Sequence, residues 1–241
     1  MQPTSTVGQI ALETPGATRV FERLGIDYCC GGKTSLASAC AAAGLAPDDV
    51  LSRIEREATS AGQSEGLTDF RSATLAELVT HIVERHHAFT RNEIERLDAL
   101  LDKVCSAHGA RHPELSRVRD LFRELAAELA PHMLKEERVL FPHIVRLEEA
   151  ARAGLPAAPP PFVTVRNPVR VMSSEHHNAG ELLRSIRRLS GDFIVPADGC
   201  ISYRTLYGAL EEFERDLHQH IHLENNVLFP RAVELESSMT V

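Results

Sequence analysis

Two segments of the chain carry the same pattern of chemically active residues. Each has a histidine, a glutamate four residues later and then the sequence Val-Leu-Phe-Pro, first from His132 and again from His220. His220 lies 88 residues after His132, and Glu224 lies 88 residues after Glu136. A histidine and a glutamate four residues apart share one face of a helix. The duplication therefore indicates a metal site built from two similar halves.

Helical periodicity places these side chains among apolar ones. Five potential metal ligands interrupt the apolar stripes of three predicted helices: His132, Glu136, His176, His220 and Glu224. A buried glutamate without a partner costs on the order of several kcal/mol, unless it stays protonated. Two such glutamates require positive charge between them, and a pair of metal ions would supply it.

A fourth histidine is expected from the first helix of the same bundle, where His86 and His87 are adjacent. They point about 100° apart around the helix, and each aligns with apolar neighbours, so periodicity alone does not choose between them. His176 precedes His220 by 44 residues, while His87 precedes His132 by 45 and His86 precedes it by 46. The duplication therefore favours His87.

The predicted ligand set combines four imidazoles with two carboxylates: His87, His132, Glu136, His176, His220 and Glu224. This donor set suits iron, manganese or zinc, whereas structural zinc sites have four ligands and often use cysteine. Six side chains shared by two ions, with the glutamates bridging, leave positions open for solvent or a small oxidant. An oxo bridge between two ferric ions, or a hydroxo bridge between two ferrous ions, would keep the net charge small.

Four long amphipathic segments must position this set. Thr74-Leu-Ala-Glu77 is a capping box that predicts the start of the first helix. The four helices are expected over residues 74–105, 113–149, 168–190 and 202–236. Pro131 and Pro142 predict local kinks in the second helix. With a proline-rich crossover over residues 151–168, the pattern predicts an all-α four-helix bundle. His218 and His222 fall on the outer, polar face of the last helix.

A small helical module precedes the bundle. Helices are predicted from Thr14-Pro15, from Ser35 to Ala43 and from Pro47 onward. A segment rich in small residues then follows, so we expect domains over residues 1–62 and 68–238. About 60 residues make a weak core alone. The module is therefore expected to pack on the bundle or on a second chain, as in a homodimer.

Cys29 and Cys30 lie in the segment Asp27-Tyr-Cys-Cys-Gly-Gly-Lys33 of this module. One interpretation is two small, half-buried residues of the core. The other is a thiol pair on an exposed glycine-rich turn, where Lys33 favours the thiolate and the sulfurs bind metal or exchange disulfides. Adjacent α-carbons lie about 3.8 Å apart, below the usual span of a disulfide. A disulfide between the two is therefore not expected.

Composition excludes several classes of protein. The net charge of −8 argues against a general nucleic-acid surface. No run of about 18 apolar residues predicts a membrane helix, and the N-terminus has no signal-peptide pattern. The expected compartment is the cytoplasm. There, five cysteines, an odd number, are expected as thiols or ligands rather than as a disulfide framework.

These motifs together resemble the RIC (repair of iron centres) family, whose members join a hemerythrin-like four-helix domain to a short N-terminal domain. The resemblance rests on four motifs that span nearly the whole chain: Asp27 to Lys33, His132-x-x-x-Glu136, Ser174-Glu-His176 and His220-x-x-Leu-Glu224-Asn-Asn-Val-Leu-Phe-Pro230. It implies a di-iron centre bridged by Glu136 and Glu224, with His87 as the ligand from the first helix. Pro131, directly before His132, departs from the family pattern.

The resemblance also implies a function, the repair of iron–sulfur clusters damaged by nitric oxide or peroxide. The clients are then damaged iron–sulfur proteins, and the protein donates iron to them, with Cys29 and Cys30 as a thiol relay. One alternative is an enzyme that reduces nitric oxide or peroxide at the di-iron site. Another is an oxygen or redox sensor. The residues of the site are compatible with all three.

Overall fold

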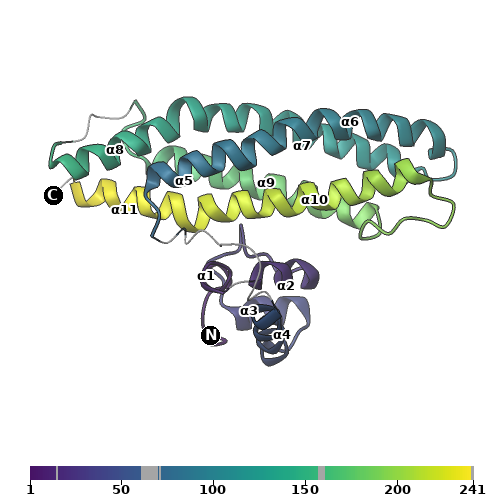
Figure 1. Cartoon of the computed structure of the whole chain (residues 1–241), viewed down its shortest axis with the longest axis horizontal. Helices are drawn as coiled ribbons and strands as arrows, with labels where there is room; N and C mark the ends of the chain where they lie inside the picture. Colours follow the sequence, from purple (N-terminus) through teal and green to yellow (C-terminus); the bar gives the residue numbers. More distant parts are fainter. Residues whose placement is uncertain (15, 61–69, 71, 157–160, 240–241) are drawn as a thin grey trace.

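The computed structural model describes residues 1–14, 16–60, 70, 72–156 and 161–239. These residues form helices and connecting turns without a β-strand, and a small N-terminal domain lies against one long side of a helical bundle (Figure 1). This confirms the predicted all-α fold. The boundary that we predicted between residues 62 and 68 falls outside the described residues.

Four long helices form the bundle, and three of them contain a π-helical segment. In chain order they are α5 (Leu75–His81), η1 (Ile82–His87) and α6 (Ala88–His108); α7 (Glu114–Lys135), η2 (Glu136–Leu140) and α8 (Phe141–Ala153); α9 (Arg166–Leu189); and α10 (Ile201–Leu223), η3 (Glu224–Leu228) and α11 (Phe229–Met239). Contacts link α6 to α7, α7 to α9, α9 to α10 and α10 back to α6. The four helices therefore surround a common core.

Local signals mark both ends of the first helix, while helix ends differ from the predicted bounds by up to four residues. The Thr74 side chain accepts a hydrogen bond from the amide of Glu77, and the Glu77 carboxylate accepts one from the amide of Thr74. This reciprocal pair satisfies two amides that the first turn of a helix leaves without partners. The break between the first and second helices begins at Gly109, directly after α6.

The buried side chains of the bundle form two apolar clusters along its length. One includes Leu125, Leu183 and Phe213, and the other includes Ile144 and Phe229. The candidate metal ligands fall between the two clusters. His176, for example, lies between Met172 of the second cluster and Ala179 of the first.

The N-terminal domain consists of four short helices: α1 (Val7–Glu13), α2 (Ala17–Leu24), α3 (Leu36–Ala43) and α4 (Pro47–Ser60). The bounds of α3 and the start of α4 agree with the sequence prediction. The prediction at Thr14-Pro15 was wrong by two residues, because α2 starts at Ala17 after Gly16 in the left-handed conformation, and Pro15 lies outside the described residues. Helix α1 was missed, because seven residues carry too little periodicity to be recognised.

The domain packs on the bundle through the turn that carries Cys29 and Cys30. Asn226 of η3 donates from its side-chain amide to the carbonyls of Tyr28 and Cys29, both at 3.2 Å. A Cβ on Gly32 would lie 2.1 Å from Oδ1 of Asn226, so this close approach requires glycine. The module therefore rests on its own bundle, one of the two arrangements that the sequence allowed.

This docking corrects the placement of two histidines. We predicted that His218 and His222 lie on an exposed polar face, but His222 is buried and His218 is half-buried. Both rings make edge contacts with the ring of Tyr28 from the N-terminal domain. The face of α10 is polar by composition, but a neighbouring domain covers it, and periodicity within one helix cannot reveal such a cover.

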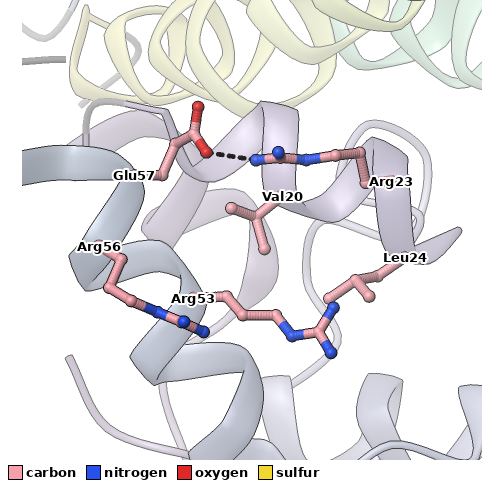
Figure 2. Close-up of a pocket in the computed structure, with 6 residues that line it drawn as sticks. All are labelled: Val20, Arg23, Leu24, Arg53, Arg56 and Glu57. Atoms are coloured by element: carbon pink, nitrogen blue, oxygen red, sulfur yellow. Dashed lines mark hydrogen bonds and ion pairs between the residues drawn. The ribbon is translucent and has the colours of Figure 1, made fainter. Parts of the chain in front are cut away.

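A separate cavity of about 530 Å³ lies on the N-terminal domain, between α2 and α4. Figure 2 shows Arg23, Arg53 and Arg56 around it, with Arg23 paired to Glu57. Its described lining is cationic and contains no histidine or cysteine, so it does not suit a metal ion. None of the helices described is both long and apolar enough to cross a lipid bilayer.

Candidate metal centre

Each of the two repeated segments forms a π turn that begins at its glutamate. Segment η2 begins at Glu136 and η3 at Glu224, and both are followed by Phe-Pro. The amides of Phe141 and Phe229 bond back to the carbonyls of Glu136 and Glu224, five residues earlier. The next residue is proline, which has no amide hydrogen, so a regular α-helical ladder cannot continue there. The sequence duplication is therefore also a duplication of backbone geometry.

The structure brings all six predicted ligands together inside the bundle. They form two groups of four residues whose candidate ligand atoms lie within 4.8 Å of one another. One group is His87, Glu136, His220 and Glu224, and the other is His132, Glu136, His176 and Glu224. Both glutamates belong to both groups. This is the arrangement expected for two cations that share two carboxylate bridges.

The Nε2 atoms of the four histidines point toward one another and toward the carboxylates. Nε2 of His87 lies 3.1 Å from Nε2 of His220, and the same distance separates Nε2 of His132 and His176. Nε2 of His176 lies 3.0 Å from Oε2 of Glu224, and Nε2 of His220 lies 3.0 Å from Oε1.

Carboxylate and amide groups around the centre hold three of these rings in place. Nδ1 of His87 lies 2.7 Å from Glu137, and Nδ1 of His132 lies 2.8 Å from Glu175. Such acceptors place the ring hydrogen on Nδ1, which leaves the Nε2 lone pair free to bind a metal. Nδ1 of His176 lies 3.0 Å from Oδ1 of Asn225.

This tautomer pattern provides a test of whether the residues fit a metal. The Nε2 lone pairs of His132 and His176 face each other at 3.1 Å in this tautomer and repel unless positive charge lies between them. Both side-chain oxygens of Glu136 and Oε2 of Glu224 are buried without a hydrogen-bond partner. Buried polar atoms normally have such a partner. Cations among the imidazoles and carboxylates would resolve both conflicts.

The pKa values of both glutamates are lowered, which shows that positive charge near them is favourable. Burial raises the pKa of Glu224, but His220 and His176 outweigh it and hold that pKa well below its usual range. Burial and Glu224 raise the pKa of Glu136, yet His132 and His87 bring it below its usual value. Both groups are therefore carboxylates, the form that binds metal.

The pKa values of two of the histidines shift in opposite directions. Burial lowers the pKa of His132, but Glu136 and Glu224 raise it to about 9. Burial dominates at His220 and lowers its pKa. The centre thus favours bound positive charge, and metal ions and protons compete for it.

His86, the alternative on the first helix, lies beside the centre rather than in it. Its Nδ1 is 3.1 Å from Oδ2 of Asp216, and its ring stacks on that of His220 at 5.7 Å. His87 is the residue of this pair that joins the ligand group. Segment η1, which ends at His87, alters the helical phase, so the two adjacent histidines are both buried.

Cys29 and Cys30 lie near this centre but outside it. Sγ of Cys30 is 3.5 Å from the backbone carbonyl of His176, and the two sulfurs are 3.9 Å apart. Of the two interpretations that the sequence left open, the core one agrees with the structure, because Cys29 is buried and Cys30 is half-buried against α9. Cys30 and burial raise the pKa of the Cys29 thiol, and Lys33 is exposed, so the thiolate is not favoured there.

Comparison with known proteins identifies the family. The sequence model of the hemerythrin HHE cation binding domain matches residues 78–232, and that of ScdA_N, a domain of unknown function (DUF542), matches residues 3–58. The "probable iron-sulfur cluster repair protein" of Haemophilus influenzae is 36% identical over 230 residues, which cover 94% of this chain and 96% of that protein. This chain belongs to the RIC family.

Further RIC relatives are similar over the same length. The "iron-sulfur cluster repair protein YtfE" of Pectobacterium carotovorum is 35% identical over 234 residues, 96% of this chain and 97% of that protein. A protein of the same name from Escherichia coli is 36% identical over 227 residues, 94% of this chain and 96% of its own length. These matches confirm the resemblance that the motifs indicated, and with it a cation-binding bundle.

Sequence reasoning missed the residues that orient the ligands. Glu137 and Asn225 each follow a glutamate of the ligand set, and Glu175 precedes His176. The repeated position of a polar residue directly after each glutamate was a signal in the sequence. Its meaning depends on the π turns, which periodicity does not predict.

Proposed function

We propose that this protein holds two iron ions between the bundle helices and repairs iron–sulfur clusters damaged by nitric oxide or peroxide. The clients are damaged iron–sulfur proteins, and the protein acts by donating iron to them. The named function of the RIC relatives supports the repair role. Reduced thiols are part of the proposal, and the cytoplasm maintains them.

The observation that carries the proposal is the sharing of Glu136 and Glu224 by both ligand groups. Each group then has two imidazoles of its own and two carboxylates in common. Imidazole with carboxylate suits iron, and without thiolate the iron is held less firmly than in a cysteine-rich site. When bound, two iron ions supply a redox couple and a reserve of transferable iron.

The residues of the chain prepare the site for this role. Glu137, Glu175 and Asn225 fix three imidazole rings, so the ligands need little reorganisation when a metal enters or leaves. The two apolar clusters on either side limit the access of water. Loss of iron along the bundle axis is therefore unfavourable.

Cys29 and Cys30 lie on the side of the centre formed by α9 and η3. Their turn contacts α9 at the carbonyl of His176, and Asn225 donates to the carbonyl of Cys29 at 3.4 Å while its oxygen faces His176. The thiol pair is thus linked to a ligand of the centre through one side chain. We propose that these thiols receive iron on its way to a client.

The proposal is tested with a purified enzyme whose iron–sulfur cluster has been damaged by nitric oxide. Iron-loaded wild-type protein should restore its activity above the level reached with the same amount of free ferrous iron. The Glu136→Ala variant should bind less than two irons per chain and restore no more than free iron does. Glu212→Ala, at an exposed position of α10, is the matched control and should behave as wild type.

Two results would contradict iron donation. The first is full iron loading without any recovery above free iron. The second is catalytic turnover of nitric oxide or peroxide with a reductant, while the iron stays on the protein during recovery of the client. The second result would favour the reductase alternative over donation.

A further inference from the structure

A third group of potential metal ligands lies outside the bundle, in the turn between α2 and α3. It consists of Asp27, Cys29 and Cys30, whose ligand atoms all lie within 4.8 Å of one another. The sulfurs are 3.9 Å apart, and Sγ of Cys29 is 3.5 Å from Oδ1 of Asp27. These residues share no ligand with the six-residue centre.

Two of these distances, between the two sulfurs and between Cys29 and Asp27, match what one tetrahedral ion would require. With metal–sulfur bonds of about 2.3 Å and a metal–oxygen bond of about 2.0 Å, tetrahedral angles put the two sulfurs about 3.8 Å apart. The same geometry puts each sulfur about 3.5 Å from the oxygen. We propose that Asp27, Cys29 and Cys30 bind one thiophilic divalent cation, such as Fe²⁺ or Zn²⁺, at a site separate from the bundle centre.

The turn holds these ligands in position through its own backbone. Oδ1 of Asp27 accepts hydrogen bonds from the amides of Cys30 at 2.9 Å and Gly31 at 3.0 Å. A Cβ on Gly31 would lie 2.8 Å from the backbone oxygen of Asp27, so the turn closes this tightly only with glycine. The Cys29 thiol also donates to Oδ1, and a cation would take the place of that proton.

The charges around the group favour a bound cation. Two thiolates and one carboxylate carry three negative charges. Arg184 of α9 lies 3.5 Å from Oδ2 of Asp27 but is also paired with Glu181, so it offsets only part of that charge. A divalent ion would therefore offset most of the remaining negative charge at this partly buried turn.

The site has room for a fourth ligand and excludes hard cations. Asp27, Cys29 and Cys30 border a cavity of about 580 Å³ between the N-terminal domain and α9. Gly180 of α9 also borders it next to Cys30, and a Cβ there would be 3.8 Å from the sulfur. Water or a donor atom of another molecule can complete the tetrahedron from this cavity. Thiolates select against Mg²⁺ and Ca²⁺, which prefer oxygen ligands.

The proposal concerns binding and does not depend on the repair function. The probe is Co²⁺, added without oxygen to the full-length apoprotein with its thiols reduced. Cobalt bound to thiolate gives a sulfur-to-metal charge-transfer absorption, which cobalt bound only to histidine and glutamate lacks. Wild-type protein should develop this absorption with one equivalent of Co²⁺ per chain, in addition to the cobalt taken up by the bundle.

Variants separate this site from the bundle and from the other cysteines. Cys30→Ser should lose the absorption and one equivalent of cobalt, and Asp27→Asn should bind that equivalent at least tenfold more weakly. Glu224→Ala should lose bundle cobalt but keep the charge-transfer absorption. Cys200→Ser, at an exposed and lone cysteine, is the control and should leave it unchanged.

Two outcomes would overturn the proposal. One is a wild-type protein that fills its bundle centre with cobalt but shows no sulfur-to-metal absorption. The other is an absorption that persists in Cys30→Ser or disappears in Cys200→Ser. Circular dichroism of each variant shows whether the helices are retained, and zinc competition against the cobalt signal gives a second measure that does not require a change of residue.

Discussion

Gly32 lies at the contact between the N-terminal domain and the bundle, so a substitution there should weaken the docking of that domain. Gly32 does not require a positive φ, so alanine can adopt its backbone conformation. Its Cβ, however, would lie 2.1 Å from Oδ1, 2.7 Å from Cγ and 2.8 Å from Nδ2 of Asn226. The Gly32→Ala variant must therefore displace the Asn226 amide.

The cost follows from the hydrogen bonds that this amide makes. Nδ2 of Asn226 lies 3.2 Å from the carbonyls of Tyr28 and Cys29 and 3.0 Å from Nδ1 of His222. Losing two such bonds, at about 0.5–1.5 kcal/mol each, weakens docking by about 2 kcal/mol. That change raises the population of the undocked state about 30-fold.

The assay is the labelling rate of Cys29 by a thiol reagent, followed by peptide mapping. Cys29 is 5% exposed, so labelling requires the turn to open. When closing is faster than labelling, the rate follows the open population, and Gly32→Ala should label about 30 times faster than wild type. Gly208→Ala is the matched control, because a Cβ there meets nothing within 4 Å.

A double variant tests the cause. If Gly32→Ala acts only through Asn226, then Gly32→Ala combined with Asn226→Ala should label no faster than Asn226→Ala alone. The reasoning is refuted if Gly32→Ala labels within threefold of wild type, or if the two single effects multiply in the double variant.

Three further predictions concern separate residues. Burial raises the pKa of Glu22 to about 7, so the wild-type protein should lose stability as pH rises from about 4.5 to 7. Glu22→Gln should remove this loss. In urea denaturation at pH 8 the variant should be more stable by about 1–2 kcal/mol, a range that allows for the partial exposure of Glu22. Glu175→Ala should weaken metal binding about 10- to 100-fold in chelator competition, because it frees the ring of His132, and an unchanged affinity would exclude that orienting role. Arg187→Met should destabilise the fold by about 2–3 kcal/mol at pH 7, since it leaves the buried Glu214 without its cation. The loss should shrink as pH falls, because the raised pKa of Glu214 eases its protonation, and a loss that does not change with pH would contradict this.

The helical bundle could be predicted because its signals are local. The capping box at Thr74 and the apolar stripes act within one or two turns, and the structure reproduces them. The gathering of His132, Glu136, His220 and Glu224 could be predicted as well, because the duplicated segments lie on amphipathic helices whose pattern is also local. Carboxylates among apolar residues indicated where the candidate ligands would gather, and the structure brings these side chains together.

The remaining features depend on contacts between distant residues. The π turn at Glu136 adds one residue to a helical turn, and an α-helical wheel therefore assigns the wrong direction to residues near it. The placement of His222 was wrong because its cover, Tyr28, lies nearly 200 residues earlier in the sequence. The burial of Cys29 follows from the same docking, since the turn looks exposed when the module is considered alone.

The π turn at η3 joins the metal centre and the domain interface in one structural unit. Three successive residues there have three tasks: Glu224 faces both ligand groups, Asn225 faces His176 and the thiol turn, and Asn226 holds that turn to the bundle. A regular helix spreads three consecutive side chains about 100° apart, and the wider π turn redirects them within one segment. Asn225 thus contacts both a candidate ligand and the thiol turn, so the candidate centre and the docked turn share one short backbone segment.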